Sequence, residues 1–353
     1  MLAILIFCVL TAILIFHQVF TQGLYSSMIM AALCVAAALT ALNYYEIAAA
    51  FLSNLGLAAW APHTISLMAI FILSLLGLRE ITDRFLPGNM KFSMIIDRLG
   101  SFVFSLIAAL TITGIIALGL QSAPVPAKIL GFDRCGENMD NPELDKNLFP
   151  NADRFVLSLM EQASKYSLAG KNSFVHNHPD MLRGLYLNRL VPEKHQGTRH
   201  EAHPDAIRVI NFWRVNTPLI DNNGKQIVED PDKTYLGVNL NIKSGTNDRK
   251  NHGARDADGS VRFALGHIRL VGFDPTRSVT SGLSVYPIGF INSDSDRVEI
   301  SPINTGKRYS GNVNVSLLFA WPNNIKDSPP RYIEFKRSAR ANVDSKKILA
   351  NIK

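Results

Sequence analysis

The sequence LGSFVFSLIAALTITGIIALGL, residues Leu99–Leu120, decides how the chain is organised. It holds no charged side chain, and as a helix it is roughly 33 Å long, enough to cross a hydrocarbon core of about 30 Å. A charged segment, Arg79–Arg98, precedes it, and a polar, basic region follows it to Lys353. The run therefore predicts a membrane-spanning helix that joins a membrane domain to a water-soluble domain.

Small side chains recur at every fourth position of this run. They are Ser101, Ser105, Ala109, Thr113 and Ala117. In lipid, burial from water cannot drive helix association, and a stripe of small residues lets a second helix approach closely. The pattern predicts a helix-packing face. The alternative interpretation is that Ala and Ser are simply common in membrane spans.

Charge divides the chain into two unlike parts. Residues 1–120 hold four Lys and Arg and four acidic residues, so the net charge of +7 belongs to the remainder. Some 230 residues are ample for a folded core. Cys8 and Cys34 lie in apolar runs and Cys135 is alone in the second part, so cysteine usage does not settle the redox compartment.

Hydropathy predicts three further spans, at about 1–20, 24–42 and 62–78, which makes residues 1–122 an all-α, four-span membrane domain. The first run lacks a basic leader, so we interpret it as a retained helix. Its only ionisable side chain, His17, is a candidate for an intramembrane role or a side chain that reaches the interface. Residues 47–59 are apolar but short, and predict an interfacial or re-entrant segment.

Positive charge in short loops predicts the orientation. With four spans, both termini share one side of the membrane. The loop 79–98 carries four Lys and Arg, whereas the N-terminal end has no cationic side chain. This distribution places the loop in the cytoplasm and the C-terminal part outside it.

Three features resemble a known family: Gly23 opening an Ala-rich helix, Tyr45-Glu46-Ile47-Ala48, and the run Ile95–Gly100 with Asp97, Arg98 and Gly100. Together they resemble the CvpA family, the colicin V production proteins. The resemblance covers residues 1–122. It implies a four-span protein of the bacterial inner membrane, a role in toxin production or export, and Gly23, Asp97, Arg98 and Gly100 as family motif residues.

Residues 123–150 predict a linker, because Ala123-Pro124-Val125-Pro126 is extended. An α+β domain is predicted over 151–341. It begins with a helix whose apolar face holds Phe155, Leu159, Met160, Ala163 and Tyr166. This face is interpreted as core packing rather than a partner site.

Period-two alternation from about residue 206 predicts an antiparallel β-sandwich as the core of this domain. The clearest strands are Thr234–Ile242 and Val313–Trp321. Further candidates are Ile207–Trp213, Phe263–Phe273, Val285–Ile291 and Tyr332–Lys336. The order of strands resembles immunoglobulin-like sandwich domains on exported bacterial proteins, which implies binding or scaffolding.

Histidines gather in two polar segments and supply the weak metal candidates His176, His178, His200 and His203. Paired His on an extended strand suits Zn²⁺ or Cu²⁺, but both segments are turn-prone, and solvated loops are the favoured interpretation. Similarly, Asp256-Ala257-Asp258-Gly259 resembles a fragment of a calcium loop but predicts a turn.

The sequence contains no Gly-Asp-Ser-Gly or G-x-S-x-G pattern, no H-E-x-x-H and no phosphate-binding glycine loop. We therefore predict no enzyme and no cofactor. The basic C-terminal residues include Lys336 and Arg337 and a tail over 342–353. They are interpreted as a solvated terminus, or as a surface attracted to anionic lipid or acidic envelope polymers. No aromatic residues interleave with them, so nucleic acid is not predicted as a partner.

Three functions remain open. The first is a multi-pass inner-membrane protein that anchors an extracytoplasmic binding or scaffold domain, in toxin production or export or in envelope maintenance. Its partners would be the lipid bilayer, membrane or envelope proteins, or a second copy of the chain. The alternatives are a transporter or channel component, and a membrane-tethered hydrolase whose catalytic residues the sequence does not reveal.

Overall fold

The computed structural model describes residues 2–56, 61–86, 90, 92–135, 144, 146–166, 173–190, 200–215, 219–221, 224–227, 230–245, 253–256, 258–274, 281–292, 297–322 and 328–345. The chain divides into two compact units. The first unit comprises Met1–Ala49, Ala61–Arg134 and Leu144–Ala169. The second unit comprises Ala50–Trp60, Cys135–Glu143 and Gly170–Lys353.

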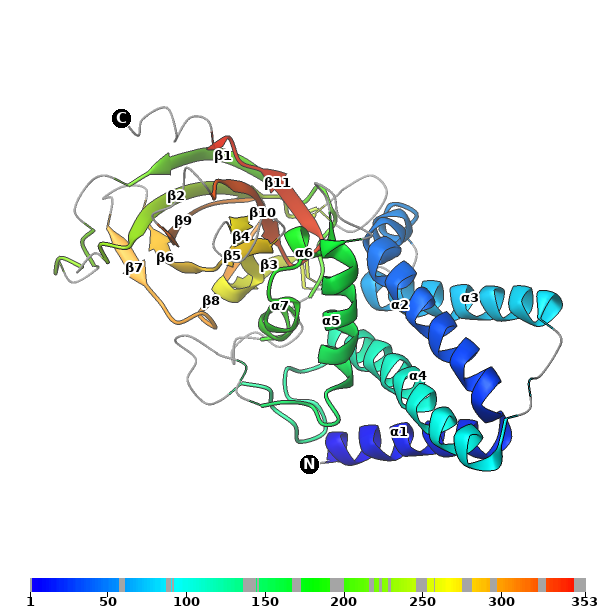
Figure 1. Cartoon of the computed structure of the whole chain (residues 1–353). Coiled ribbons are helices and arrows are strands. Elements are labelled where there is room, and N and C mark those ends of the chain that lie inside the picture. The colour runs from blue at the N-terminus through cyan, green and yellow to red at the C-terminus, as the bar shows by residue number, and fades with distance from the viewer. Residues whose placement is uncertain are drawn as a thin grey trace. The chain divides into compact units, whose positions relative to one another are not determined.

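Four long helices dominate the N-terminal part of the chain (Figure 1): α1 (Leu2–Thr21), α2 (Gly23–Asn54), α3 (Pro62–Phe85) and α4 (Met94–Ser122). All four are long and apolar enough to cross a membrane. The prediction of an apolar four-helix region is therefore confirmed, and these helices imply a lipid bilayer as their environment.

Helix α2 is longer than the predicted span. It runs without a break past Tyr45 and Glu46 to Asn54, so the predicted separate segment at 47–59 is wrong over its described part. Between Gly23 and Gly56 the chain has neither Gly nor Pro, and Ala-rich sequence favours continuation of a helix. Gly56 has a φ of +72°, the left-handed conformation in which many helices end.

The small-residue stripe of α4 faces other helices. All five of its members are buried: Ser101, Ser105, Ala109, Thr113 and Ala117. Ser27 of α2 lies between two of them, with its Oγ 3.2 Å from Ser101 Oγ and 3.4 Å from Ser105 Oγ. On α1, Thr11 donates to Thr113 Oγ1 at 3.4 Å. Small side chains thus bring α1 and α2 close to α4.

Helix α5 (Ala152–Lys165) also belongs to the first unit, although the sequence placed it in the C-terminal domain. It crosses α4 at Gly114, where a Cβ would lie 2.3 Å from the carbonyl oxygen of Ala152. The buried face of α5 therefore differs from the predicted one. The buried residues are Ala152, Asp153, Val156, Met160 and Ser164, and only Met160 was expected.

Part of the predicted linker packs on the helices. Leu148 is buried in a cluster with Ala3, Phe7 and Ala117. Arg134 is also buried and forms an ion pair with Asp153 of α5, whose carboxylate accepts a second hydrogen bond from Gln121 at 3.0 Å. These contacts explain why a segment with extended, Pro-rich sequence joins the first unit instead of remaining a solvated tether.

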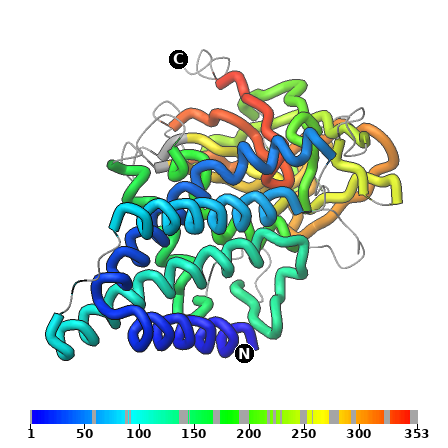
Figure 2. The backbone as a smooth tube through the Cα atoms, turned by 90° about the vertical axis from the view of Figure 1, so that its right-hand side faces the viewer, coloured from blue at the N-terminus to red at the C-terminus, as the bar shows by residue number. Residues whose placement is uncertain are grey.

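The second unit contains short helices and three antiparallel sheets (Figure 1 and Figure 2). The helices are α6 (Phe174–Asn177) and α7 (Met181–Asn188), with a 3₁₀ turn at Leu265–His267. The strands are β1 (Ile207–Arg214), β2 (Lys233–Ile242), β3 (Ser260–Ala264), β4 (Ile268–Asp274), β5 (Ser281–Val285), β6 (Pro287–Ile291), β7 (Val298–Ile300), β8 (Gly306–Ser310), β9 (Val313–Pro322), β10 (Pro330–Phe335) and β11 (Ala339–Asn342). The sheet orders are β1-β2-β9-β6-β7, β11-β10-β4-β5 and β3-β8.

The mostly-β fold is confirmed, but two predicted strands are each two strands. Phe263–Phe273 spans β3, the 3₁₀ turn and β4, and Val285–Ile291 spans the end of β5 and all of β6. In both places the chain changes sheet: β3 pairs with β8 whereas β4 pairs with β10, and β5 pairs with β4 whereas β6 pairs with β9. Apolar residues lie on both sides of each crossing, so hydropathy alone does not show the break.

Candidate functional site

The turn between α1 and α2 meets the first turn of α4, as Figure 1 and Figure 2 both show. Gly23 has a φ of +72°, and the N–H of Leu24 donates to Asp97 Oδ1 at 2.8 Å. The carboxylate therefore caps α2 from a different helix. A negative group at this position also complements the positive end of the α2 dipole.

The other two motif residues lie at the same junction. The guanidinium carbon of Arg98 is 5.3 Å from the centre of the Phe20 ring at the end of α1. A Cβ at Gly100 would lie 2.5 Å from Cδ1 of Leu24, so a larger residue there would displace the Leu24 side chain. Gly23, Asp97, Arg98 and Gly100 thus converge in one helix junction. The junction holds three helix ends together through a hydrogen bond, a cation–π contact and close packing.

Replacing Gly23 by alanine is expected to lower the stability of the first unit by about 1 kcal/mol or more. The left-handed backbone disfavours a side chain there, and the new methyl group would lie 3.2 Å from both oxygens of Asp97. Thermal unfolding of the full chain in detergent measures this effect. Gly77→Ala in α3 is the matched control, because no atom lies within 4 Å of its added methyl group. Equal melting temperatures for the two variants would contradict a special role for Gly23.

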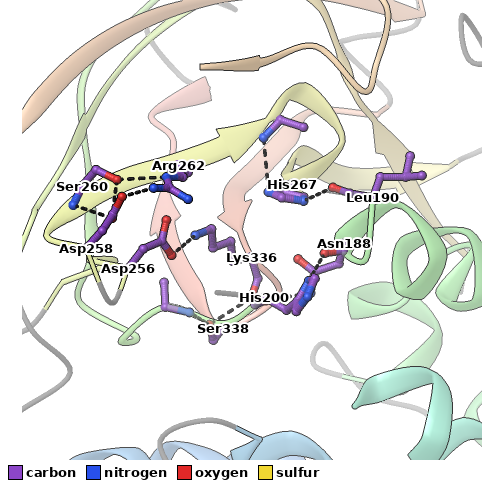
Figure 3. A network of polar contacts seen from close by, with 12 residues as sticks. Asn188, Leu190, His200, Asp256, Asp258, Ser260, Arg262, His267, Lys336 and Ser338 are labelled. Atoms are coloured by element: carbon purple, nitrogen blue, oxygen red, sulfur yellow. Dashed lines mark hydrogen bonds and ion pairs between the residues drawn. The ribbon is translucent and has the colours of Figure 1, made fainter. Parts of the chain in front are cut away.

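A buried polar network occupies the second unit (Figure 3). Lys336 was expected at a solvated terminus, but its side chain is fully buried and its Nζ lies 3.9 Å from Asp256 Oδ1. Lys336 and Arg337 form the turn between β10 and β11, both with positive φ. Asp256 lies in the predicted turn, which the N–H of Gly259 closes by donating to the Asp256 carbonyl at 3.1 Å. The ion pair therefore links two turns that are distant in sequence.

Two histidines flank Lys336 in this network. Nδ1 of His267 accepts from the Ala264 N–H at 3.2 Å, and Nε2 lies 2.9 Å from the carbonyl oxygen of Leu190, to which it donates. These partners fix a neutral ring. Burial, followed by the charge of Lys336 and by His200, lowers the pKa of His267 well below its ordinary value.

His200 is held by a reciprocal pair of hydrogen bonds. Its Nδ1 lies 2.9 Å from the Asn188 carbonyl oxygen, and Asn188 Nδ2 donates to the His200 carbonyl at 2.7 Å. Burial lowers the pKa of this imidazole as well. The network thus ties the end of α7 and the segment before β1 to the β10–β11 turn. Buried polar groups whose partners are all within the network stabilise the fold. A substrate would have to displace the core to reach them, which argues against catalysis at this network.

The sequence offered no local signal for Lys336, Asp256 or His267 as members of one network. Lys336 reads as part of a basic run, and Asp256 as a turn residue. His267 lies alone between apolar residues. The pairing of β4 with β10 brings His267 close to Lys336, and Asp256 reaches Lys336 from the turn before β3.

The four candidate metal ligands have separate surroundings. His176 is buried in α6, His178 packs on the Phe174 ring at 4.6 Å, and His200 belongs to the network. His203 Nε2 lies 3.1 Å from Oδ1 of Asn54 in the same unit. Among the described residues, no three His, Cys, Asp or Glu side chains are placed to hold a metal ion. In the first unit, His17 is exposed on α1.

A second buried ionic group crosses the sheet β11-β10-β4-β5. Glu334 of β10 is opposite both Arg269 of β4 and Arg340 of β11, and its two oxygens accept from their Nε atoms at 2.7 and 2.8 Å. Arg269 also donates to the carbonyl oxygen of Asn177 at 3.2 Å. Burial lowers the pKa of Arg269, but the Glu334 carboxylate, together with Tyr286 and Tyr332, more than offsets this and raises the pKa above its ordinary value.

No protein-family model, curated protein or solved structure matches the chain. The resemblance to the CvpA family therefore stays a prediction based on residues 1–122.

Proposed function

We propose that this chain is a multi-pass protein of the bacterial inner membrane whose four apolar helices anchor an extracytoplasmic binding or scaffold domain. Its role would be in envelope maintenance or, as the CvpA resemblance implies, in the production or export of a toxin peptide. Binding is favoured over catalysis because the titratable groups of the sheet networks are engaged with one another inside the fold.

The observation that carries this proposal is the distribution of positive charge around the helix ends. Arg79 and Arg84 lie in the last turns of α3, and Arg98 lies in the first turns of α4. No Lys or Arg occurs in α1 or α2. Short loops rich in Lys and Arg remain in the cytoplasm, which directs the region after α4 to the other side.

Convergence of the motif residues supports the proposed family relationship. Gly23, Asp97, Arg98 and Gly100 are far apart in sequence and lie in one junction between α1, α2 and α4. Residues that share a structural task in this way are the kind that a family retains as a motif.

Labelling of single cysteines tests the topology. Cys34 and Cys135 are buried, so the three native cysteines are replaced by serine and new cysteines are introduced as Lys225→Cys and Arg84→Cys, both at exposed positions. In intact spheroplasts a membrane-impermeant maleimide is expected to label K225C and to spare R84C. Both variants should react once detergent opens the membrane. Labelling of R84C alone in intact spheroplasts would invert the proposed topology.

A further inference from the structure

The outer face of the strands β1, β2 and β9 carries a tryptophan beside several asparagines. These strands lie side by side in the five-stranded sheet (Figure 1). Leu236, Val238, Leu240 and Ile242 of β2 are fully buried in the core, so the alternate residues of β2 point to the opposite face. The pairing aligns three rows there: Trp213, Gly237 and Leu318; Asn211, Asn239 and Ser316; Arg208, Asn241 and Asn314.

The indole of Trp213 lies against Gly237 of β2. A Cβ built on Gly237 would be 2.3 Å from Cε2 and 2.8 Å from Nε1 of the indole, so the ring covers the glycine directly. Trp213 is partly exposed. Its outer surface is an apolar plate with the negative potential of an aromatic face, which attracts the C–H groups of a sugar ring.

Amide groups extend the face beyond Trp213. Nδ2 of Asn241 donates to Oδ1 of Asn314 at 2.7 Å, which leaves the Asn241 oxygen as an acceptor and the Asn314 nitrogen as a donor. Oδ1 of Asn211 accepts from the N–H of Phe212 at 2.9 Å, and its Nδ2 remains a donor. A sugar hydroxyl both donates and accepts, so neighbouring amide donors and acceptors complement it.

The rest of this face is closed. Leu219, Tyr235, Val298 and Leu318 form a buried cluster over the neighbouring part of the sheet. The polar part therefore begins at Trp213 and ends at the row of Arg208. Its exposed members are Arg208, Asn211 and Asn314, whereas Ser316 is buried. Rows on one strand face are roughly 6.8 Å apart and strands roughly 4.8 Å apart, so the surface suits a short oligosaccharide.

We infer that this face, defined by Trp213, Asn211, Asn241 and Asn314, binds a neutral polysaccharide chain. Arg208 is the only charged residue in the three rows, whereas an anionic lipid or a nucleic acid is bound through several cationic side chains. The inference rests on the proposed binding function and names its ligand class.

Binding of soluble oligosaccharides to the purified full chain tests the inference. The protein is kept in a detergent without a sugar headgroup, and chitohexaose and cellohexaose are titrated while tryptophan fluorescence and heat are recorded. At least one of them is expected to bind and to change the emission of Trp213. Asn314→Ala, at an exposed position, and Trp213→Ala are each expected to weaken binding about tenfold or more. Lys225→Ala, on an exposed loop, should leave it unchanged.

Absence of binding to both oligosaccharides would overturn the inference, as would unchanged affinity in the Asn314→Ala variant. Tighter binding of heparin at the same face would assign it to anionic polymers instead, and would also overturn it. Because these measurements use purified protein, they are independent of the side of the membrane on which the domain lies. A failed topology test and a failed binding test are therefore distinguishable.

Discussion

Replacing Glu334 by glutamine is expected to lower the free energy of unfolding of the second unit by about 3–5 kcal/mol. The carboxylate is buried between Arg269 and Arg340, and each of its oxygens accepts a hydrogen bond from one of them. Glutamine keeps the shape but removes the charge. Arg269, whose side chain is only 8% exposed, would then remain buried without its carboxylate.

Urea unfolding of the full chain in detergent measures this loss. Trp321 lies in the core of the second unit and donates its indole N–H to the Ser328 carbonyl at 2.9 Å, so its fluorescence reports that unit. Glu299→Gln is the matched control. Glu299 accepts from Lys307 at 2.8 Å, but both side chains are partly exposed, and such surface pairs contribute less than about 1 kcal/mol. Equal losses in the two variants would show that Arg269 reaches solvent or another partner.

The contrast between these two glutamates shows why much of the site could not be predicted from the sequence. Each glutamate lies between two apolar residues in a short strand, and each has basic residues nearby along the chain. Burial separates them, and burial depends on which strands cover the residue. Strand order is set by pairing between distant strands, and period-two alternation in a single sequence does not reveal which strands pair.

The four membrane helices could be predicted more accurately, because the bilayer requires a pattern that appears in each local stretch of sequence. Spans must be long and nearly free of charge, so hydropathy located all four helices, and small residues at every fourth position located the buried face of α4. The rule stops at the membrane surface. It therefore gave no information on the extension of α2 to Asn54, or on the packing of α5 against Gly114.

Acidification is expected to destabilise the second unit between about pH 6.5 and pH 5. Burial lowers the pKa of both His200 and His267 in the folded protein, whereas the unfolded chain has the ordinary value near 6.5. The unfolded state therefore binds more protons in this range. The stability from the two neutral rings is present above the unfolded pKa near 6.5 and is lost as the pH falls below it, by at most about 1.4 kcal/mol per pH unit for each ring.

The physical cause lies in the hydrogen bonds and charges of the network. Protonation of His267 would place its Nδ1–H against the Ala264 N–H, and would add positive charge beside Lys336, whose Nζ lies 3.9 Å from Asp256 Oδ1. Besides burial, the charges of Lys336 and Arg189 oppose protonation of His200, whereas its hydrogen bond with the Asn188 carbonyl and the charge of Glu201 favour it. Acid should therefore loosen the contact between α7, the segment before β1 and the β10–β11 turn.

Urea unfolding at a series of pH values, followed by the fluorescence of Trp321, provides the measurement. His267→Gln keeps a donor for the Leu190 carbonyl but does not titrate, so the variant is expected to be less stable at pH 7.5 and to show about half the wild-type pH slope. His17→Gln, at an exposed position on α1, should leave the slope unchanged. A wild-type free energy of unfolding that stays constant from pH 7.5 to 5.5 would mean that acid-charged histidines are accommodated, and that the network does not require neutral rings.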